Sequence, residues 1–120
     1  MPRDPDYKSD MVYLWHLHKA CEELCAYLDK STLAEFNSST LLQDAIYWKL
    51  NVIGEAIGNL SEEFKDSHPD IPFYEARAVR NRIVHGYDTI DNDIIWNITS
   101  EHIPKLLHQI TPLIPTPPED

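Results

Sequence analysis

The sequence predicts an all-α protein, an antiparallel bundle of four helices, with five helices as the alternative. Long segments repeat apolar residues at the three- and four-residue steps of one helix face, stretches rich in proline or polar residues separate them, and no segment of useful length alternates like a strand. With 120 residues the chain is expected to form one domain, 1–120, which is small enough to gain from dimerisation. We predict short mobile ends at 1–9 and, rich in proline, at 111–120.

The first predicted helix spans 10–29 and is amphipathic. Its apolar stripe consists of Leu14, Leu17, Cys21, Leu24 and Leu28. The sequence turns polar over 30–39, so we expect a connecting segment there. Ser38, Ser39 or Thr40 can cap the next helix, because a hydroxyl accepts a hydrogen bond from the free N–H groups of a first turn.

The second predicted helix is the longest and runs from about Leu41 to Leu60 or Phe64. Gly54 and Gly58 lie on one side of it, a single turn apart. Each glycine lowers helix propensity by about 1 kcal/mol but lets another backbone come close. We favour a close helix contact at this pair of glycines over a ligand site.

The third predicted helix begins at Pro72 or Phe73 and reaches about His85, since the prolines of 66–72 end the preceding helix. Gly86 suits the left-handed residue that often ends a helix, which places Tyr87 on a loop.

Acidic residues at 88–93 then cap and begin a fourth helix, whose positive end they stabilise. Its stripe consists of Ile95, Ile98, His102 and Leu106.

The net charge of −10 is the main compositional evidence against a nucleic-acid partner, because phosphate binding draws on a basic surface. Local charge can outweigh the total, however. Arg77, Arg80 and Arg82 fall within six residues, and no acidic residue lies between Glu75 and Asp88. We therefore expect one cationic patch on the third helix, in which Arg77 and Arg82 bind phosphate.

A cytoplasmic location with no membrane partner is the expectation. No apolar run approaches the roughly 20 residues of a spanning helix, and the first residues lack the basic-then-apolar order of a secretory signal. Cys21 and Cys25 lie in an apolar pattern, so we interpret them as free core thiols rather than a redox pair. Two cysteines without a histidine pair at ligand spacing make a poor zinc site, and no metal site is expected.

The segment 80–87 carries the candidate chemistry. Metal-free RNA cleavage needs a base for the proton of the ribose 2′-hydroxyl and a fixed cation for the charge on the phosphate. An imidazole titrates near neutral pH and a guanidinium stays charged, so His85 and Arg80 suit these tasks. Asn81 shares a helix face with His85, whereas Arg80 is about 140° away from His85 on an ideal helix. An arginine and a histidine at this spacing also arise by chance on a solvated face.

The pattern R-N-x-x-x-H-x-Y at 80–87 on the third helix of a small bundle resembles the HEPN superfamily, specifically the HepT-like toxins. Three further segments are similar to that family's pattern, and together they cover about 41–110. They are Ile53-Gly54-Glu55-Ala56, Ile71-Pro72-Phe73, and Trp96 with Ile103-Pro104 and Leu106.

The resemblance implies a metal-independent endoribonuclease without a cofactor, the toxin of a type VII-like toxin–antitoxin system, with its cleft between two subunits of a homodimer. Arg80 and His85 are its implied catalytic pair, and Asn81 supports them. The implied partner is a minimal nucleotidyltransferase antitoxin, which transfers AMP from ATP to Tyr87. Such a phosphate would fill the space of an RNA phosphate. The alternative is that Tyr87 packs over the helix end and is never modified.

Two other readings of the chain remain open: a non-catalytic nucleotide-binding or adaptor HEPN domain, and a structural partner of a nucleotidyltransferase. Glu55 stands among apolar residues, where an unpaired charge is costly, so we expect it to pair with an arginine of the third helix as a supporting residue. The tryptophans are expected in the core or in dimer contacts. They are Trp15, Trp48 and Trp96.

Overall fold

In the computed structural model the chain is described over residues 5–86 and 88–115, with side chains from Ser9 onward. The described part contains helices and no strand, as predicted. In order, the elements are α1 (Pro5–Asp29), α2 (Leu33–Ser38), α3 (Thr40–Asn59), α4 (Glu62–Asp66), α5 (Phe73–Gly86), α6 (Asn92–Ile110) and the 3-10 turn η1 (Thr111–Leu113). The four long helices are those expected from the sequence, and α2 and α4 are additional short ones.

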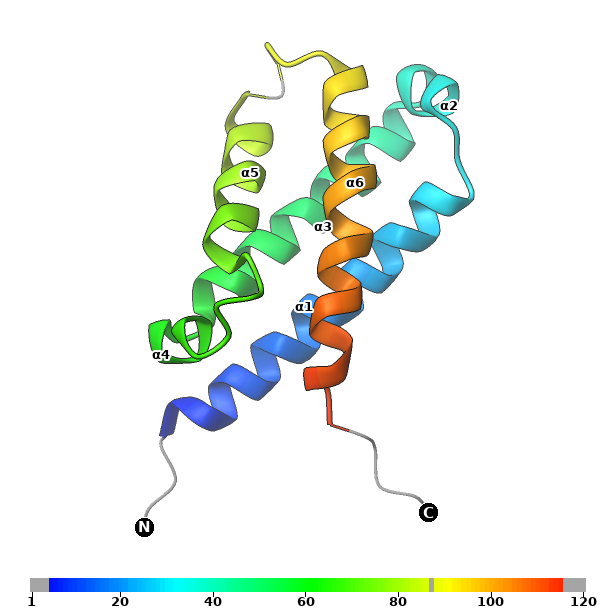
Figure 1. Cartoon of the computed structure of the whole chain (residues 1–120). Coiled ribbons are helices and arrows are strands. Elements are labelled where there is room, and N and C mark those ends of the chain that lie inside the picture. The colour runs from blue at the N-terminus through cyan, green and yellow to red at the C-terminus, as the bar shows by residue number, and fades with distance from the viewer. Residues whose placement is uncertain (1–4, 87, 116–120) are drawn as a thin grey trace, which may run out of the picture.

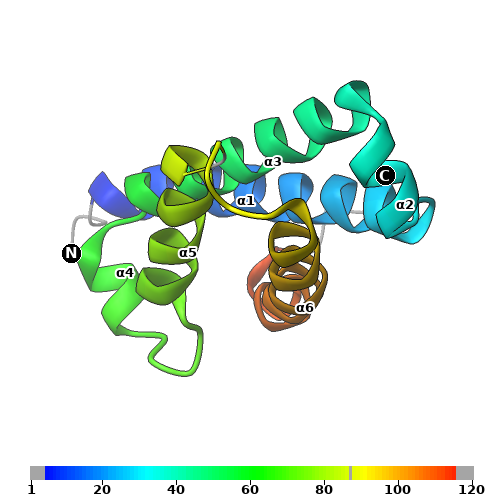
Figure 2. The ribbon, with the colours of Figure 1, turned by 90° about the horizontal axis from the view of Figure 1, so that it is seen from above.

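The long helices form two layers, which Figure 1 and Figure 2 show from two sides. α1 and α3 pack together in one layer, while α5 lies on α3 and α6 lies on α1 in the other. α5 and α6 make little contact with each other. The core lies between the layers and holds fully buried side chains from every long helix, including Leu14, Leu17, Ile53, Ile57, Phe73, Ile83, Ile95 and Ile110.

The polar stretch 30–39 is not merely a connection, because α2 forms inside it. Thr32 and Glu35 make a capping box: the Thr32 hydroxyl accepts from the Glu35 N–H at 3.1 Å, and the Glu35 carboxylate accepts from the Thr32 N–H at 3.0 Å. This turn buries the ring of Phe36 completely. A threonine followed three residues later by a glutamate was the signal that the prediction overlooked.

The cap of α3 is Ser39, one of the three predicted residues, and its side chain accepts from the Leu42 N–H. The predicted extension of this helix to Phe64 is wrong. After Asn59 the chain turns, and the carboxylate of Asp10 in α1 accepts hydrogen bonds of 2.7 Å from both the N–H and the hydroxyl of Ser61. Ser61 then caps α4, so the long helix is divided in two.

The ends of the chain also differ from the prediction. α1 begins at Pro5 rather than at 10, so the predicted terminal segment 1–9 is shorter, and 5–9 belong to a helix. A proline suits the first turn of a helix, where its missing N–H has no partner to lose. At the other end, 111–113 form η1. Residues 1–4 and 116–120 lie outside the described residues.

Gly86 ends α5 as predicted, but not in the left-handed conformation, since no described glycine has a positive φ. Its carbonyl instead accepts from the N–H groups of Thr89 and Ile90, each at 2.9 Å. A Cβ on Gly86 would come within 3.1 Å of the Ile90 side chain, so this glycine serves a close approach. Tyr87 lies outside the described residues. α6 begins from the cap Asp91, within the predicted acidic segment.

Cys21 is buried and Cys25 is half-buried, and both are free, as predicted. None of the helices in the described part is long and apolar enough to cross a membrane. Over the same residues, no group of three or more His, Cys, Asp or Glu side chains is placed to hold a metal ion.

Candidate functional site

α5 carries the candidate catalytic residues on two different sides. The side chain of Arg80 points toward α3 and is only 7% exposed, whereas His85 is exposed. His85 makes no hydrogen bond or ion pair with any other described residue, and Asn81 between them is half-buried. The expectation that Arg80 and His85 cannot support each other directly within one helix is therefore consistent with the structure.

A glycine of α3 makes room for the guanidinium of Arg80. A Cβ built on Gly54 would overlap the Nε and Cζ atoms of Arg80, so the guanidinium lies directly against the backbone of α3 at this glycine. We call this position of an arginine over a glycine a seat. The two glycines of α3 thus allow a close approach, as predicted, but the approaching groups are arginine side chains rather than a second backbone. The seat on Gly54 explains how a charged group enters the interface between α3 and α5.

The Arg80 guanidinium is held loosely at this seat. Nη1 donates to the Asn51 Oδ1 at 3.5 Å, Nη2 is 4.0 Å from the Glu55 Oε1, and the buried Nε has no hydrogen-bond partner among the described residues. Strong hydrogen bonds of a guanidinium to a carboxylate are nearer 2.8 Å. The arginine therefore keeps hydrogen-bonding capacity for a further oxygen ligand.

As expected, Glu55 pairs with an arginine of α5, which is Arg80. The expectation that the carboxylate is surrounded by apolar residues is wrong, because the Glu55 side chain is 67% exposed. An exposed pair of this kind contributes about 1 kcal/mol or less. An anion with better geometry can therefore take its place at Arg80.

A groove opens beside this seat, on the same edge of α3. Its volume is about 650 Å³, and it is lined by Thr40, Gln43, Asp44, Tyr47, Trp48, Asn51, Val84 and Asn92. Trp48, which the prediction placed in the core or in a dimer contact, is 62% exposed at the groove. Asn51 lines the groove and also bonds Arg80, and Val84 lies directly before His85. The groove therefore adjoins Arg80 through Asn51.

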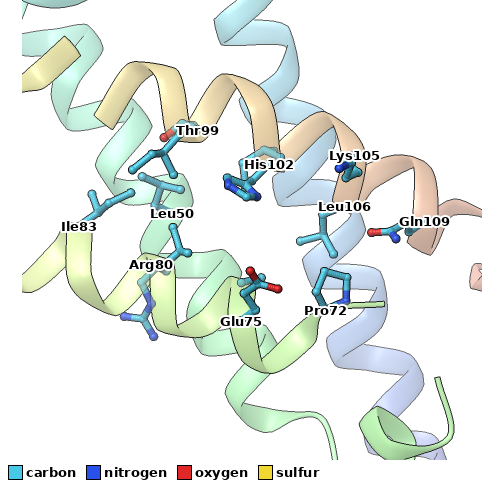
Figure 3. A pocket seen from close by; sticks show the side chains of 14 residues that line it. Leu50, Pro72, Glu75, Arg80, Ile83, Thr99, His102, Lys105, Leu106 and Gln109 are labelled. Carbon is cyan, nitrogen blue, oxygen red and sulfur yellow. The ribbon is translucent and has the colours of Figure 1, made fainter. Parts of the chain in front are cut away.

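A second cavity lies between α5 and α6, on the side of α5 away from the Arg80 guanidinium. Figure 3 shows Arg80 at its edge with the guanidinium pointing away from it, while His102 points into it from α6. Its lining is mostly apolar and includes Val79, Ile83 and Leu106. The enclosed space of about 50 Å³ holds little more than a water molecule.

The remaining predicted arginines lie on different sides of α5, since Arg82 lines a hollow that faces the start of α6. Arg77 and Arg82 are exposed on α5, and Arg77 lies over Gly58, where a built Cβ would be 2.9 Å from its guanidinium. The structure thus brings together Arg80, Glu55 and the previously unnoticed Asn51, and it leaves His85 apart. The signal for Asn51 was a polar residue four positions before Glu55, which places both on the same face of the helix.

Comparison with known proteins finds relatives over most of the chain. Residues 17–113 match a family model described as Ribonuclease HepT-like. A protein of Caldanaerobacter subterraneus subsp. tengcongensis, named "Putative RNase", is 30% identical over 107 residues, which cover 89% of this chain and 96% of that protein. A protein of Thermococcus cleftensis, named "Probable ribonuclease HepT", is 30% identical over 99 residues, or 82% of this chain and 90% of that protein.

A longer protein of Methanocaldococcus jannaschii, named "Gamma-glutamylcyclotransferase and putative RNase", is 33% identical over 103 residues. The match covers 86% of this chain but 46% of that protein, so the chain spans less than half of this relative. No solved structure matches the chain.

Proposed function

Because the chain belongs to the HepT-like ribonuclease family, we propose that it is a metal-independent RNA endonuclease and the toxin of a toxin–antitoxin pair. The observation that carries the proposal is the Arg80 guanidinium, which lies against Gly54 with its two Nη groups only weakly engaged, at 3.5 Å from the Asn51 Oδ1 and 4.0 Å from the Glu55 Oε1. A fixed cation with spare donors is what a phosphate in reaction requires.

In the proposed reaction, His85 accepts the proton of a ribose 2′-hydroxyl. The 2′-oxygen forms a bond to the neighbouring phosphorus, and the bond from phosphorus to the 5′-oxygen of the next nucleotide breaks. That 5′-oxygen leaves and takes a proton from water, and the phosphate remains as a 2′,3′-cyclic ester. Arg80 donates to the non-bridging oxygens as their negative charge grows, and Asn81 supports the imidazole. No cofactor takes part.

The active cleft lies between two copies of the chain. Arg80 faces α3 and His85 is exposed elsewhere on α5, so one protomer does not bring them together. In a two-fold dimer, His85 of one protomer meets Arg80 of its partner, and two equivalent sites result. Arg77 and Arg82, exposed on the same helix, bind neighbouring phosphates of the RNA.

Control by a minimal nucleotidyltransferase is proposed from the family and from the motif. The Tyr87 oxygen attacks the α-phosphorus of ATP and loses its proton, and pyrophosphate leaves. The AMP adds negative charge just beyond α5, where it competes with RNA for the arginines. Incubation with such a partner and ATP should add one AMP to the wild type and none to Tyr87→Phe, as measured by intact mass. Equal addition to both proteins would contradict the role of Tyr87.

The proposed activity is tested by cleavage of single-stranded RNA in excess EDTA. We expect the wild type to cleave, and Arg80→Ala and His85→Ala to lose activity by a factor of about 100 or more while keeping their helical circular dichroism. The matched control for a lost cation is Lys105→Ala, which removes an exposed positive charge from α6 and should cleave normally. Undiminished cleavage by either α5 variant contradicts the proposal.

A second candidate function is a non-catalytic adaptor that binds a nucleotide or a nucleotidyltransferase. The net charge of −10 and the 7% exposure of Arg80 favour it. Tight binding of a mononucleotide, with no turnover of any RNA by the wild-type dimer, would decide for this function.

A further inference from the structure

The groove beside Trp48 has the features of a site for an unpaired nucleobase. It combines an exposed indole with three amide side chains on its walls, Gln43, Asn51 and Asn92. We infer that this groove binds a base of single-stranded RNA, stacked on Trp48, while the adjoining phosphate lies at Arg80. This inference rests on the proposed nuclease function and adds to it a subsite for the substrate.

Hydrogen bonds indicate which way each amide points. The Tyr47 hydroxyl donates to the Asn92 Oδ1 at 3.1 Å, and Arg80 donates to the Asn51 Oδ1, so both amides keep their NH₂ groups as donors. The Gln43 Nε2 donates to the Phe36 carbonyl at 2.8 Å, which keeps its Oε1 as an acceptor.

The groove thus offers two amide donors and one amide acceptor that have no other hydrogen-bond partner among the described residues, with the hydroxyl of Thr40 beside them. The edges of nucleobases carry the same mixture of donors and acceptors. A purely apolar partner would leave these groups unpaired, which is costly. The lining therefore fits a base better than a hydrophobic side chain.

Trp48 supplies the stacking surface. A tryptophan that is 62% exposed is unusual unless its ring meets a partner, and a base is a flat apolar partner with polar edges. Trp15 has a similar exposure of 50%, but it lies on α1, lines none of these walls, and has Lys19 over its ring at 5.2 Å. The chain therefore contains a matched tryptophan as a control.

Binding through a base also fits the acidity of the chain. With a net charge of −10 and Asp44 on the wall of the groove, the protein gains little from a long run of phosphate contacts. Stacking does not depend on that charge. We therefore expect a moderate salt dependence: the three arginine–phosphate contacts proposed above lose about 20-fold in affinity between 50 and 200 mM salt. Duplex RNA should bind less well than a single strand, because its bases are already stacked.

The experiment measures binding of a fluorescein-labelled single-stranded hexaribonucleotide by anisotropy, with the His85→Ala substitution in every protein so that the RNA stays intact. Adding Trp48→Leu should weaken binding about tenfold, equivalent to about 1.4 kcal/mol of stacking. Adding Trp48→Phe should restore most of the affinity because a phenyl ring still stacks. Adding Trp15→Leu should leave it unchanged.

Sedimentation of each protein and cleavage by the same substitutions without His85→Ala complete the test. Unchanged affinity with Trp48→Leu overturns the inference, and normal RNA cleavage by the wild type then leaves the nuclease function standing. Dissociation of a dimer by Trp48→Leu, with the affinity per folded chain unchanged, also overturns it and makes the groove a contact between copies of the chain. A wild type that binds the hexamer but cleaves no RNA contradicts the nuclease function alone. A wild type that binds no RNA contradicts both.

Discussion

Gly54 and Gly58 lie one turn apart on α3, and each receives an arginine of α5, but the two seats differ in depth. At Gly54 a Cβ would overlap the guanidinium of Arg80, which is buried between Asn51 and Glu55. At Gly58 the nearest Arg77 atoms are 2.9 Å from a built Cβ, and Arg77 is exposed. Arg77 can move away at little cost, whereas Arg80 can move only by losing its contacts with Asn51 and Glu55.

A glycine paired with an arginine therefore has two different uses in this protein. A glycine beneath an exposed arginine lets two helices pack closely, and other side chains could do this with a small shift. A glycine beneath a buried arginine fixes the position of a charge. The difference comes from the neighbours, because polar side chains one turn apart enclose only the first seat. The predictions below test whether this difference has the functional consequence that we propose.

The largest expected effect is that of Gly54→Ala. The new methyl group displaces the Arg80 guanidinium, so RNA cleavage should fall about 100-fold, and the stability should fall by about 1–3 kcal/mol from overpacking. Phenylglyoxal, followed by mass spectrometry of the peptide, should modify Arg80 faster than in the wild type. Gly58→Ala is the control: it should cleave RNA within about threefold of the wild type and gain up to about 1 kcal/mol in helix propensity. Equal losses in the two variants would contradict the comparison.

Asn51→Ala should have a smaller effect. It removes the hydrogen bond to the Arg80 Nη1 and one wall of the groove, so we expect cleavage to fall about tenfold, as for the loss of about 1.4 kcal/mol. Asn59→Ala is the matched control, since its amide bonds the Glu55 carbonyl on the exposed surface of the same helix. Single-turnover rates measure both. If the two asparagine variants behave alike, Asn51 does not position Arg80.

Glu55→Gln should change little in the fold. The pair at 4.0 Å is exposed on the glutamate side, so the free energy of unfolding should change by less than about 1 kcal/mol in urea denaturation. The affinity for RNA at low salt should rise, because a negative charge beside the phosphate site is removed. Weaker binding of RNA by this variant would show that the carboxylate holds Arg80 in place rather than competing for it.

The two cysteines of α1, Cys21 and Cys25, also differ in burial. We expect this difference to have no effect on RNA cleavage. Burial raises the pKa of the Cys21 thiol well above its usual range, and burial followed by the charge of Asp29 raises the pKa of Cys25. A raised pKa means less thiolate at pH 8, and the thiolate is the form that alkylates. Iodoacetamide should therefore react with Cys25 first, as checked by peptide mass spectrometry. Faster reaction at Cys21 would contradict its burial.

Much of the fold was predictable because it depends on local patterns. The apolar stripes indicated the four long helices, and Ser39 and Asp91 lie where caps were expected. The errors arose where a distant residue decides the local structure. α3 stops because Asp10, 51 positions away, binds the turn at Ser61, and Gly86 is fixed by Ile90 rather than by its own φ.

The candidate residues could be named from the sequence, but their arrangement in space could not. The residues Arg80 and His85 follow from the motif, and the pairing of Arg80 with Glu55 follows from the cost of a lone charge. The seat on Gly54, the part of Asn51 and the groove at Trp48 did not follow, because each depends on how α5 lies across α3. Periodicity gives the face of a helix, but it does not give the register between two helices.

The central claim is that the active cleft joins Arg80 of one protomer to His85 of its partner. The most direct measurement mixes Arg80→Ala with His85→Ala under conditions in which subunits exchange, and follows RNA cleavage. After exchange, half of the dimers contain one chain of each variant, and each such dimer has one complete site and one incomplete site. The account therefore predicts that two inactive proteins recover about a quarter of the wild-type rate when mixed. A mixture that stays as inactive as its components would contradict a shared site.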